Sequence, residues 1–257
     1  MRIVPISFTT GKSKPINSYQ QRPILPAMKC DSVSFGATTS QVKKVVILLG
    51  APNSGKGTYA RKIAEKYAIP QISTGDILRN EVKKMSKLGI IAKQHMESGG
   101  LVPDELIMQI FQQRIAQKDC QRGFILDGFP RTINQAEQLN EILSKDKNIA
   151  LKIINLDVDK DILFERSANR YTCADCSRTY AIKEGYDPEA SKCECGGKLI
   201  KRADDTPEVL ANRLVNYEKQ TFPLINYYGE QVSNIGVHGK DIPINEILEE
   251  VYSQIEK

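Results

Sequence analysis

An apolar run at residues 45–49 leads directly into a glycine-containing loop and then into a helical pattern, and this succession constrains the fold more than any other feature. The loop is GAPNSGKGT at residues 50–58, and the helical pattern extends from Thr58 to Tyr67. A strand, a glycine loop and a helix in this order are typical of a P-loop, in which backbone N–H groups and a helix N-terminus surround a phosphate. A plain glycine turn before a helix is the alternative, but the lysine and both flanking elements favour the P-loop.

Lys56 is the charged residue of this loop, and its ammonium group is predicted to reach the β- and γ-phosphates of a nucleotide. The next residue departs from the general pattern. Gly57 stands where Ser or Thr is usual, and the hydroxyl comes one residue later, at Thr58.

Strand-like and helical segments alternate along most of the chain. Apolar runs typical of strands recur at residues 45–49, 124–126, 153–158 and, more weakly, 232–237. Helical patterns lie at residues 58–67, 105–117, 133–143, 160–168, 207–220 and 245–255. The alternation predicts an α/β fold with a doubly wound parallel sheet covered on both faces. Two segments, 73–102 and 171–203, interrupt it and are predicted to be inserted lobes.

The positive charge is concentrated at the N-terminal end. The net charge is +5, and residues 1–41 contribute +4 of it, from Arg2, Lys12, Lys14, Arg22 and Lys29 against Asp31. The remainder is nearly neutral, which argues against a nucleic-acid binder because such a protein presents a basic face. No apolar run approaches the ~18 residues that a membrane-spanning helix needs.

Residues 1–41 contain ten Ser or Thr and four Pro, without an apolar pattern of either helical or strand period. This composition predicts a disordered basic extension. The alternative is an organellar targeting segment, because acidic residues are scarce. The absence of a continuous apolar stretch argues against a secretory signal.

The cysteines are clustered. Cys173, Cys176, Cys193 and Cys195 fall within 23 residues, and in a chain without a secretory signal this favours metal binding over disulfides. Of the other two, Cys30 lies in the N-terminal segment, and Cys120 is predicted to be a semi-buried thiol before a strand.

Two further motifs place charged residues beside predicted strands. DGFPRT at residues 127–132 follows the run at 124–126, and Asp127 at a strand's carboxyl end suits the outer shell of a Mg²⁺ site. Arg131 offers a bidentate fork for a second phosphate. ISTGDILR at residues 72–79 places Arg79 on a helix.

Together with the P-loop, these motifs resemble the adenylate kinase family, in its bacterial-type long form with a zinc-binding lid. The resemblance covers about residues 43–257 and includes GLVPDE at 100–105, KRADD at 201–205, NRL at 212–214 and TFPLI at 221–225. It implies a P-loop nucleoside monophosphate kinase fold over residues 42–257. The expected parts are a core (42–72, 103–169 and 204–257), an AMP-binding lobe (73–102) and a zinc-ribbon-like lid (170–203).

The resemblance also implies residue roles. Phosphoryl transfer depends mainly on positioning and charge neutralisation, and the implied catalytic residues are Lys56, Asp127, Arg131, Arg170, Arg202 and Arg213. Arg166 is expected to pack on the ATP adenine, and Thr179 and Tyr180 to contact ATP from the lid. The implied ATP-binding residues are Asn53, Ser54, Gly55, Lys56, Gly57, Thr58, Arg166, Arg170, Thr179 and Tyr180. For any single arginine, a solvated surface charge is the alternative.

On the AMP side, the family resemblance implies that Gln135 recognises the base and that Thr74 lines the same pocket. An amide both donates and accepts, so it matches the N6 and N1 edge of adenine, and Thr at positions 74 and 132 favours AMP over pyrimidine monophosphates. The implied AMP-binding residues are Thr74, Arg79, Gly100, Leu101, Val102, Gly128, Phe129, Pro130, Arg131, Gln135, Arg202 and Arg213.

The lid departs from the family in its second cysteine pair. Cys173 and Cys176 have the two-residue gap of a zinc knuckle, whereas Cys193 and Cys195 are separated by one residue where the family has two. We expect one structural Zn²⁺ that folds the lid, with free thiols or an incomplete site as the alternative. His95 is expected at the surface, and His238 stands near the ATP adenine where the family usually has Asp.

The implied function is reversible Mg²⁺-dependent transfer of the γ-phosphoryl group of ATP to AMP, giving two ADP and serving adenine nucleotide homeostasis. A GTP-using AMP kinase, a non-catalytic nucleotide sensor of the same fold and a zinc-ribbon nucleic-acid module are the alternatives. The expected partners are ATP, AMP and ADP, with neither nucleic acid nor membrane. A cytoplasmic monomer is expected, or a protein of an organelle matrix if residues 1–41 are a targeting segment.

Overall fold

The computed structural model describes residues 42–182, 191–239 and 242–257. The chain divides into two units, Met1–Ser40 and Gln41–Lys257, and every described element belongs to the second. The predicted basic extension and Cys30 therefore lie outside the described residues.

Five parallel strands form the central sheet, in the order β2-β3-β1-β4-β8. Their bounds are Lys43–Gly50 for β1, Gln71–Ser73 for β2, Gly123–Asp127 for β3, Ile149–Val158 for β4 and Val232–Val237 for β8. In the central strand, Val45 lies opposite Phe124 of β3 on one side and Leu151 of β4 on the other. The doubly wound parallel sheet expected from the sequence is confirmed.

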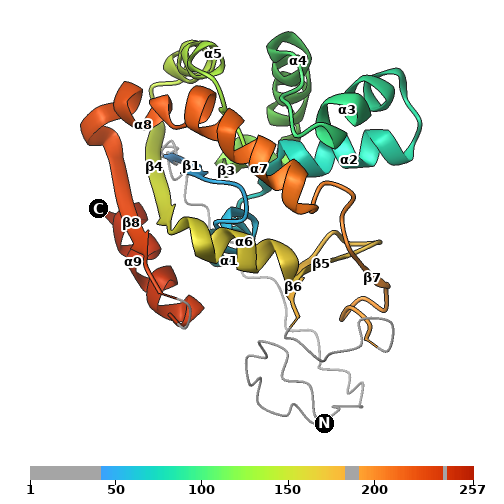
Figure 1. The fold of residues 1–257 in the computed structure, drawn as a ribbon. Coiled ribbons are helices and arrows are strands. Elements are labelled where there is room, and N and C mark those ends of the chain that lie inside the picture. The colour runs from blue at the N-terminus through green and yellow to red at the C-terminus, as the bar shows by residue number, and fades with distance from the viewer. Residues whose placement is uncertain (1–41, 183–190, 240–241) are drawn as a thin grey trace, which may run out of the picture. The chain divides into compact units, whose positions relative to one another are not determined.

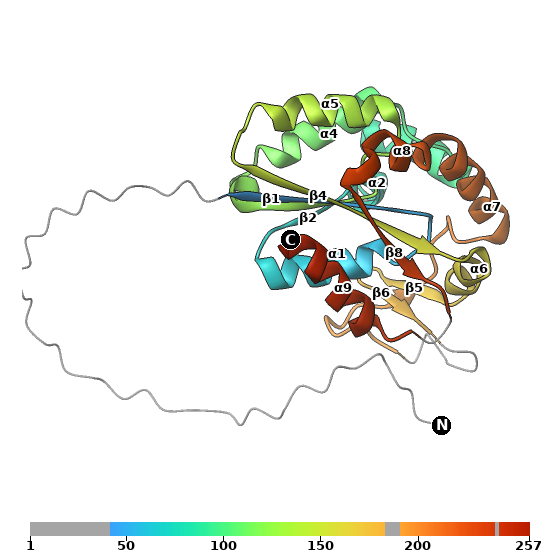
Figure 2. The ribbon, with the colours of Figure 1, turned by 90° about the vertical axis from the view of Figure 1, so that its left-hand side faces the viewer.

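The two faces of β1 explain why its sequence is apolar throughout rather than alternating. Val46 and Leu48 belong to one core cluster, with residues of helices α1 (Lys56–Tyr67) and α9 (Ile244–Glu256). Val45 and Ile47 belong to the other, with residues of helices α4 (Asp104–Ile115) and α5 (Ile133–Ser144). Successive side chains of a strand point to opposite faces, so a strand covered on both sides needs an apolar residue at every position. Figure 2 shows α4 and α5 on one side of the sheet and α1 and α9 on the other.

Four of the α-helices in the described residues begin at a capping hydroxyl. Ser73, Ser86, Thr132 and Thr206 each accept a hydrogen bond from the N–H three residues ahead, which satisfies one of the first unpaired donors of the helix. The helices are α1 (Lys56–Tyr67), α2 (Thr74–Lys83), α3 (Lys87–Glu97), α4 (Asp104–Ile115), α5 (Ile133–Ser144), α6 (Lys160–Ala168), α7 (Pro207–Asn216), α8 (Pro223–Tyr228) and α9 (Ile244–Glu256).

The two segments that interrupt the alternation of strands and helices, 73–102 and the described part of 171–203, form lobes at one end of the sheet. Helices α2 and α3 make up the first, and a three-stranded antiparallel sheet makes up the second, with β5 (Arg170–Cys173) between β6 (Thr179–Ala181) and β7 (Leu199–Ile200). In Figure 1 the two helices lie at the upper right and the small sheet at the lower right. The ammonium group of Lys83 at the end of α2 donates to the carbonyl of Ala174 at 2.7 Å, so the lobes touch.

The observed elements differ from the expected ones mainly at their ends. The short strand β2 was not expected, because three residues are too few to show a period. The expected helix at 207–220 is an α-helix over Pro207–Asn216 and continues as a π-helical turn, Tyr217–Thr221, in which the N–H of Phe222 donates to the carbonyl of Tyr217. Within the described ranges, no helix combines the length and apolar character needed to cross a lipid bilayer.

Candidate active site

The P-loop connects β1 to α1 and encloses the side chain of Lys56. The ammonium group donates to the carbonyls of Gly50 at 2.8 Å and Ala51 at 2.7 Å, and to the hydroxyl of Ser54 at 3.3 Å. No side chain caps α1, whose preceding residue Gly55 has a φ of +95° that favours glycine. The positive end of the helix and its first N–H groups are thus available to an anion.

Burial lowers the pKa of Lys56 to about 7, and the positive charges of Arg131, Arg213 and Arg170 act in the same direction, while Asp127 opposes them. A bound phosphate would supply negative charge at this place and would favour the protonated lysine. The loop is thus built for an anion rather than for a self-contained ion pair.

Asp127 ends β3 beside the P-loop. Its carboxylate accepts a hydrogen bond from the amide of Gln71 at 2.9 Å. Burial raises the pKa of this carboxyl, and the charge of Lys56 opposes the shift. A Cβ at position 57 would come within 3.3 Å of the Asp127 Oδ2, so Gly57 leaves room for the carboxylate where the general pattern has Ser or Thr. This close approach is a physical reason for the departure seen in the sequence.

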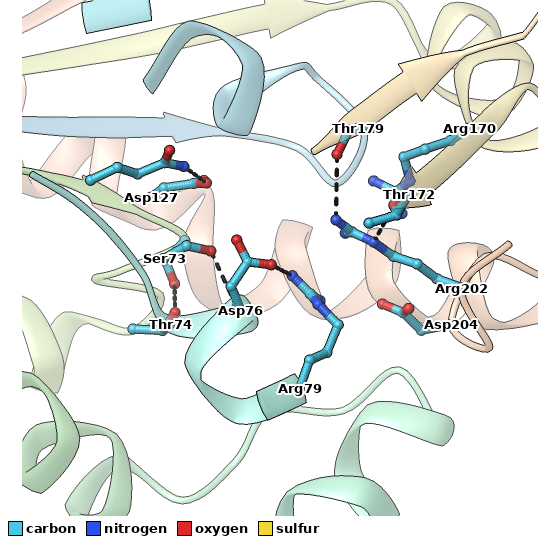
Figure 3. Close-up of polar contacts among 12 residues, drawn as sticks. Ser73, Thr74, Asp76, Arg79, Asp127, Arg170, Thr172, Thr179, Arg202 and Asp204 are labelled. Atoms are coloured by element: carbon cyan, nitrogen blue, oxygen red, sulfur yellow. Dashed lines mark hydrogen bonds and ion pairs between the residues drawn. The ribbon is translucent and has the colours of Figure 1, made fainter. Parts of the chain in front are cut away.

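Guanidinium groups from both lobes and from α7 converge on the region between the P-loop and α2. Arg202 donates to the hydroxyls of Thr172 at 2.9 Å and Thr179 at 3.5 Å, and Figure 3 shows its guanidinium between those of Arg79 and Arg170. Burial, followed by the charges of Arg79 and Arg170, lowers the pKa of Arg202 to about 10. Such mutual repulsion is relieved when a polyanion binds among the cations.

Acidic residues orient several of these arginines. Arg213 contacts Asp204 at 3.0 Å, Arg170 contacts Asp205, and Arg79 contacts Asp76 at 2.5 Å. Burial lowers the pKa of Arg213 to about 10 despite the opposing charge of Asp204. The carboxylates hold the side chains in place without removing the excess of positive charge.

A second group of residues surrounds Gly128 and Arg131. The hydroxyl of Thr74 donates to the carbonyl of Gly128 at 2.9 Å, and the Nε of Arg131 donates to the same carbonyl at 2.8 Å. Gln135 is buried, with its Oε1 accepting from the backbone N–H of Arg131 at 2.7 Å and its Nε2 donating to Asp104 at 2.6 Å. The DGFPRT segment thus joins β3, α2 and α5 at one place.

Two of the expected ATP-binding residues, Arg166 and Asn53, make contacts between α6 and the P-loop. The guanidinium of Arg166 on α6 donates to the carbonyl of Ser54 at 3.1 Å. The amide of Asn53 donates to the carbonyl of Leu163 at 3.4 Å, and its buried Oδ1 has no hydrogen-bond partner among the described residues. A loop with an unpaired buried acceptor is typical of a site that receives a ligand or water.

Not every expected residue presents its side chain to this region. The ring of Phe129 is fully buried and stacks on Phe111 with centroids 4.7 Å apart, so only its backbone is free for a nucleotide. The hydroxyl of Tyr180 lies 3.1 Å from the Sγ of Cys193 and therefore belongs to the cysteine cluster. Its contact with ATP stays a prediction.

The histidines and Cys120 are placed as follows. His95 is half-buried on α3, and His238 is exposed, with its Nδ1 3.0 Å from a carboxylate oxygen of Asp159. Cys120 was expected to be semi-buried and is in fact buried, at 4 % exposure, where burial raises the pKa of its thiol.

The four clustered cysteines meet in the lid. Their sulfur atoms all lie within 4.8 Å of one another, with Cys173 and Cys195 at 3.5 Å and Cys176 and Cys193 at 3.4 Å. A tetrahedral Zn²⁺ with Zn–S bonds near 2.3 Å separates its ligands by about 3.8 Å. The donor set and its spacing fit one zinc ion, in spite of the shortened second pair.

Sequence reasoning missed several residues that contact the expected ones, including Gln71, Asp104, Asp204 and Asp205. Three of them stand in motifs already recognised in the sequence, GLVPDE and KRADD, and this was the available signal. Gln71 carries no such signal, because its contact with Asp127 depends on the pairing of β2 with β3.

The fold and the site define a class of protein. A P-loop after the central strand, a carboxylate at the end of the neighbouring strand and arginines from two lobes form the arrangement of a P-loop phosphotransferase that acts on nucleotides. The family model for adenylate kinase matches residues 48–233. The chain is 43% identical to the adenylate kinase of Alkaliphilus oremlandii over 212 residues, which cover 82% of this chain and 97% of that protein.

Two further relatives agree. The adenylate kinase of Clostridium tetani is 44% identical over 80% of this chain and 95% of its own length. That of a Geobacter species is 48% identical over 71% of this chain and 86% of its own length. The chain belongs to the adenylate kinase family, and its function is that of this family of phosphotransferases.

Proposed function

We propose that the P-loop holds the phosphates of the donor, ATP, and that the DGFPRT segment holds the phosphate of the acceptor, AMP. Transfer of the γ-phosphoryl group between them gives two ADP. The observation that carries this proposal is a group of neighbouring buried cations, in which Lys56 and Arg131 lie beside Asp127 and Arg213 lies near both of them. Burial lowers the pKa of Lys56, Arg131 and Arg213, and also that of Arg202, which neighbours Arg170. Two nucleotides bring several negative charges face to face, and their in-line approach requires cations at this place.

On the ATP side, the P-loop N–H groups and Lys56 hold the phosphates, and Arg166 packs on the adenine. Arg170, Arg202 and Arg213 lie over the phosphoryl group during transfer and stabilise its charge. The contact of Arg202 with Thr172 and Thr179 of the lid supports this assignment, because lid closure then carries the guanidinium to the reaction centre. The remaining proposed ATP contacts are Asn53, Ser54, Gly55, Gly57, Thr58, Thr179 and Tyr180.

On the AMP side, Arg79 and Arg131 hold the phosphate, while Thr74 and Gln135 meet the base. The shared carbonyl of Gly128 supports this grouping, because it brings Thr74 and Arg131 to one place. Backbone groups are the available contacts at Phe129 and Pro130, since both side chains are buried. The remaining proposed contacts are Gly100, Leu101, Val102 and Gly128.

Two metal ions complete the proposal. Adenylate kinases use Mg²⁺ with ATP, and Asp127 is the residue that would hold the outer shell of this ion. When bound, Mg²⁺ neutralises phosphate charge. Cys173, Cys176, Cys193 and Cys195 would hold a structural Zn²⁺ in the lid, away from the transferring group.

The proposed organisation is a core of residues 42–72, 103–169 and 204–257 with an AMP-binding lobe at 73–102 and a lid at 170–203. We further propose a monomer that acts in the cytoplasm. Light scattering after size exclusion tests the first point. Fusion of residues 1–41 to a fluorescent protein tests the second, since delivery to an organelle would show a targeting segment instead.

A coupled assay with a panel of nucleoside monophosphates and both ATP and GTP as donors tests the reaction. We expect efficient turnover with AMP and ATP only. Equal or faster turnover with GTP would identify a GTP-using AMP kinase. Nucleotide binding without turnover for any pair would identify a nucleotide sensor.

A further inference from the structure

Asp104 is the first residue of α4, and its carboxylate accepts hydrogen bonds from three side chains at the start of α5. Its Oδ2 accepts from the hydroxyl of Thr132 and from the amide of Asn134, both at 2.9 Å, and its Oδ1 accepts from the Nε2 of Gln135 at 2.6 Å. Asp104 and Gln135 are far apart in the sequence, and the packing of α4 beside α5 brings them together.

The other end of the Gln135 amide is fixed as well. Its Oε1 accepts from the backbone N–H of Arg131 at 2.7 Å, and the side chain is only 2 % exposed. If the amide were rotated by half a turn, its oxygen would face the carboxylate of Asp104 and its NH₂ group would face the N–H of Arg131. Both contacts would be repulsive, so a single orientation is compatible with its surroundings.

In this orientation each polar group of the amide keeps one unused hydrogen-bonding position. The Oε1 has two lone pairs and the Nε2 has two hydrogens, and within the described part of the chain each of these atoms has one hydrogen-bond partner. An acceptor beside a donor complements adenine, which carries an amino donor at position 6 next to a ring-nitrogen acceptor. A 6-oxopurine, such as hypoxanthine or guanine, has an acceptor at position 6 and a protonated N1, and would need the rotated amide.

We propose that Asp104 is a positioning residue for base selection: it fixes the orientation of the Gln135 amide, and thereby makes the acceptor site favour a 6-aminopurine monophosphate over a 6-oxopurine monophosphate. This inference rests on the proposed role of Gln135 in recognising the base. Asp104 does not touch the nucleotide and acts through Gln135 alone.

The test compares Asp104→Asn with the unchanged protein, using AMP and IMP as acceptors and ATP as donor. An Asn side chain keeps one acceptor oxygen, which is expected to face the donors of Thr132 and Asn134. Its NH₂ group then faces Gln135, where it no longer opposes rotation of the Gln135 amide. We expect the ratio of kcat/KM for AMP to that for IMP to fall about tenfold or more, through the KM for the monophosphate. The KM for ATP should stay unchanged.

Asn134→Ala is the matched control, because the exposed side chain of Asn134 donates to the same carboxylate, whereas its other hydrogen bond within the described residues is to Gln138 rather than to the Gln135 amide. It should keep the AMP to IMP ratio of the unchanged protein. An equal fall in this control would show a loss of helix packing rather than of amide orientation, and would overturn the proposal.

Gln135→Ala separates the proposal from the function on which it rests. If Gln135→Ala leaves the AMP to IMP ratio intact, Gln135 does not recognise the base, and both that role and the role of Asp104 are wrong. If Gln135→Ala lowers the ratio whereas Asp104→Asn does not, base recognition stands and the positioning role alone is overturned.

A stability cycle provides a readout independent of activity. Gln135→Glu sets two carboxylates against each other, whereas Gln135→Glu combined with Asp104→Asn restores a donor–acceptor pair. We expect the double variant to melt at a higher temperature than Gln135→Glu alone. A double variant that melts no higher would show that the Asp104–Gln135 contact is absent in solution, and would overturn the proposal even if Asp104→Asn alone failed to fold.

Discussion

The P-loop and the cysteine lid each have a defined shape, but their surroundings differ. The P-loop continues the central strand β1, and fully buried residues such as Val46, Ile47 and Ile63 of α1 fix both of its ends. In the described part of the lid, the buried residues are few, namely Thr172, Cys173, Ile182, Ser191, Cys193 and Gly197. The core thus holds both ends of the P-loop, whereas the lid has few buried residues, and two of them are cysteines of the cluster.

The two regions also differ in charge. The P-loop end of the sheet holds cations whose pKa values are lowered by burial, so it is complementary to an anion. The cysteine cluster is complementary to a cation, because thiolates bind metal and Tyr180 adds a hydroxyl beside Cys193. We infer that substrate binding stabilises the first region and a metal ion the second.

The largest expected effect is the loss of one cation from the phosphate sites. Lys56→Ala and Arg131→Ala should each lower kcat about 10²–10³-fold, because each removes a cation that stabilises the negative charge of the phosphates during transfer. The fold should persist, which circular dichroism can check. Arg122→Ala is the control, since Arg122 is exposed before the first residue of β3, at the opposite end of that strand from Asp127. Near-normal turnover in either active-site variant would contradict the assignment.

Removal of zinc should have a smaller effect on turnover and a larger one on the lid. We expect about one zinc ion per chain in protein purified under reducing, metal-replete conditions, and a loss of that ion in Cys195→Ser but not in Cys120→Ser. Chelation should expose the lid to proteolysis before the core unfolds, with turnover falling through poor closure. Full loss of activity with an intact lid would instead indicate a catalytic ion.

A third effect concerns pH and is smaller again. The folded protein binds the Lys56 proton less tightly than the unfolded chain does, because burial lowers its pKa from an ordinary value near 10.5 to about 7. The resulting destabilisation of the folded state is fully present below pH 7. It disappears as the pH rises toward the pKa that Lys56 has in the unfolded chain.

Lys56→Met isolates this effect, since it removes the titration and keeps the apolar stem. Between about pH 6 and pH 9.5, the melting temperature of the ligand-free unchanged protein should rise by a few °C relative to that of the variant. Parallel melting curves for the two proteins across this range would show that Lys56 keeps its ordinary affinity for protons.

The smallest expected effect is that of deleting residues 1–41. Their sequence has no periodic apolar face to bury, so melting temperature and kcat should both remain within experimental error of the full chain. A clear fall in melting temperature would show that this segment packs on residues 42–257 and would add a third region to the comparison.

Local sequence determined much of this protein. The continuous apolar run before the P-loop required a strand buried on both faces, and the hydroxyls of Ser73, Thr132 and Thr206 marked the starts of helices α2, α5 and α7. These features depend on residues within a few positions of each other, so a single sequence contains them in full. The motifs that resemble the adenylate kinase family were likewise contiguous, and the family was confirmed by comparison with known relatives.

The tertiary structure alone decided which contacts join these segments. Nothing in the spacing of Gln71 and Asp127, or of Asp104 and Gln135, indicates that these side chains meet, because strand order and helix packing bring them together. The cysteine cluster makes the same point, since Cys193 and Cys195 lack the spacing of a zinc knuckle and only the fold brings all four sulfur atoms within 4.8 Å of one another. Local patterns fix backbone conformation, but the distance between side chains remote in sequence depends on how the whole core packs.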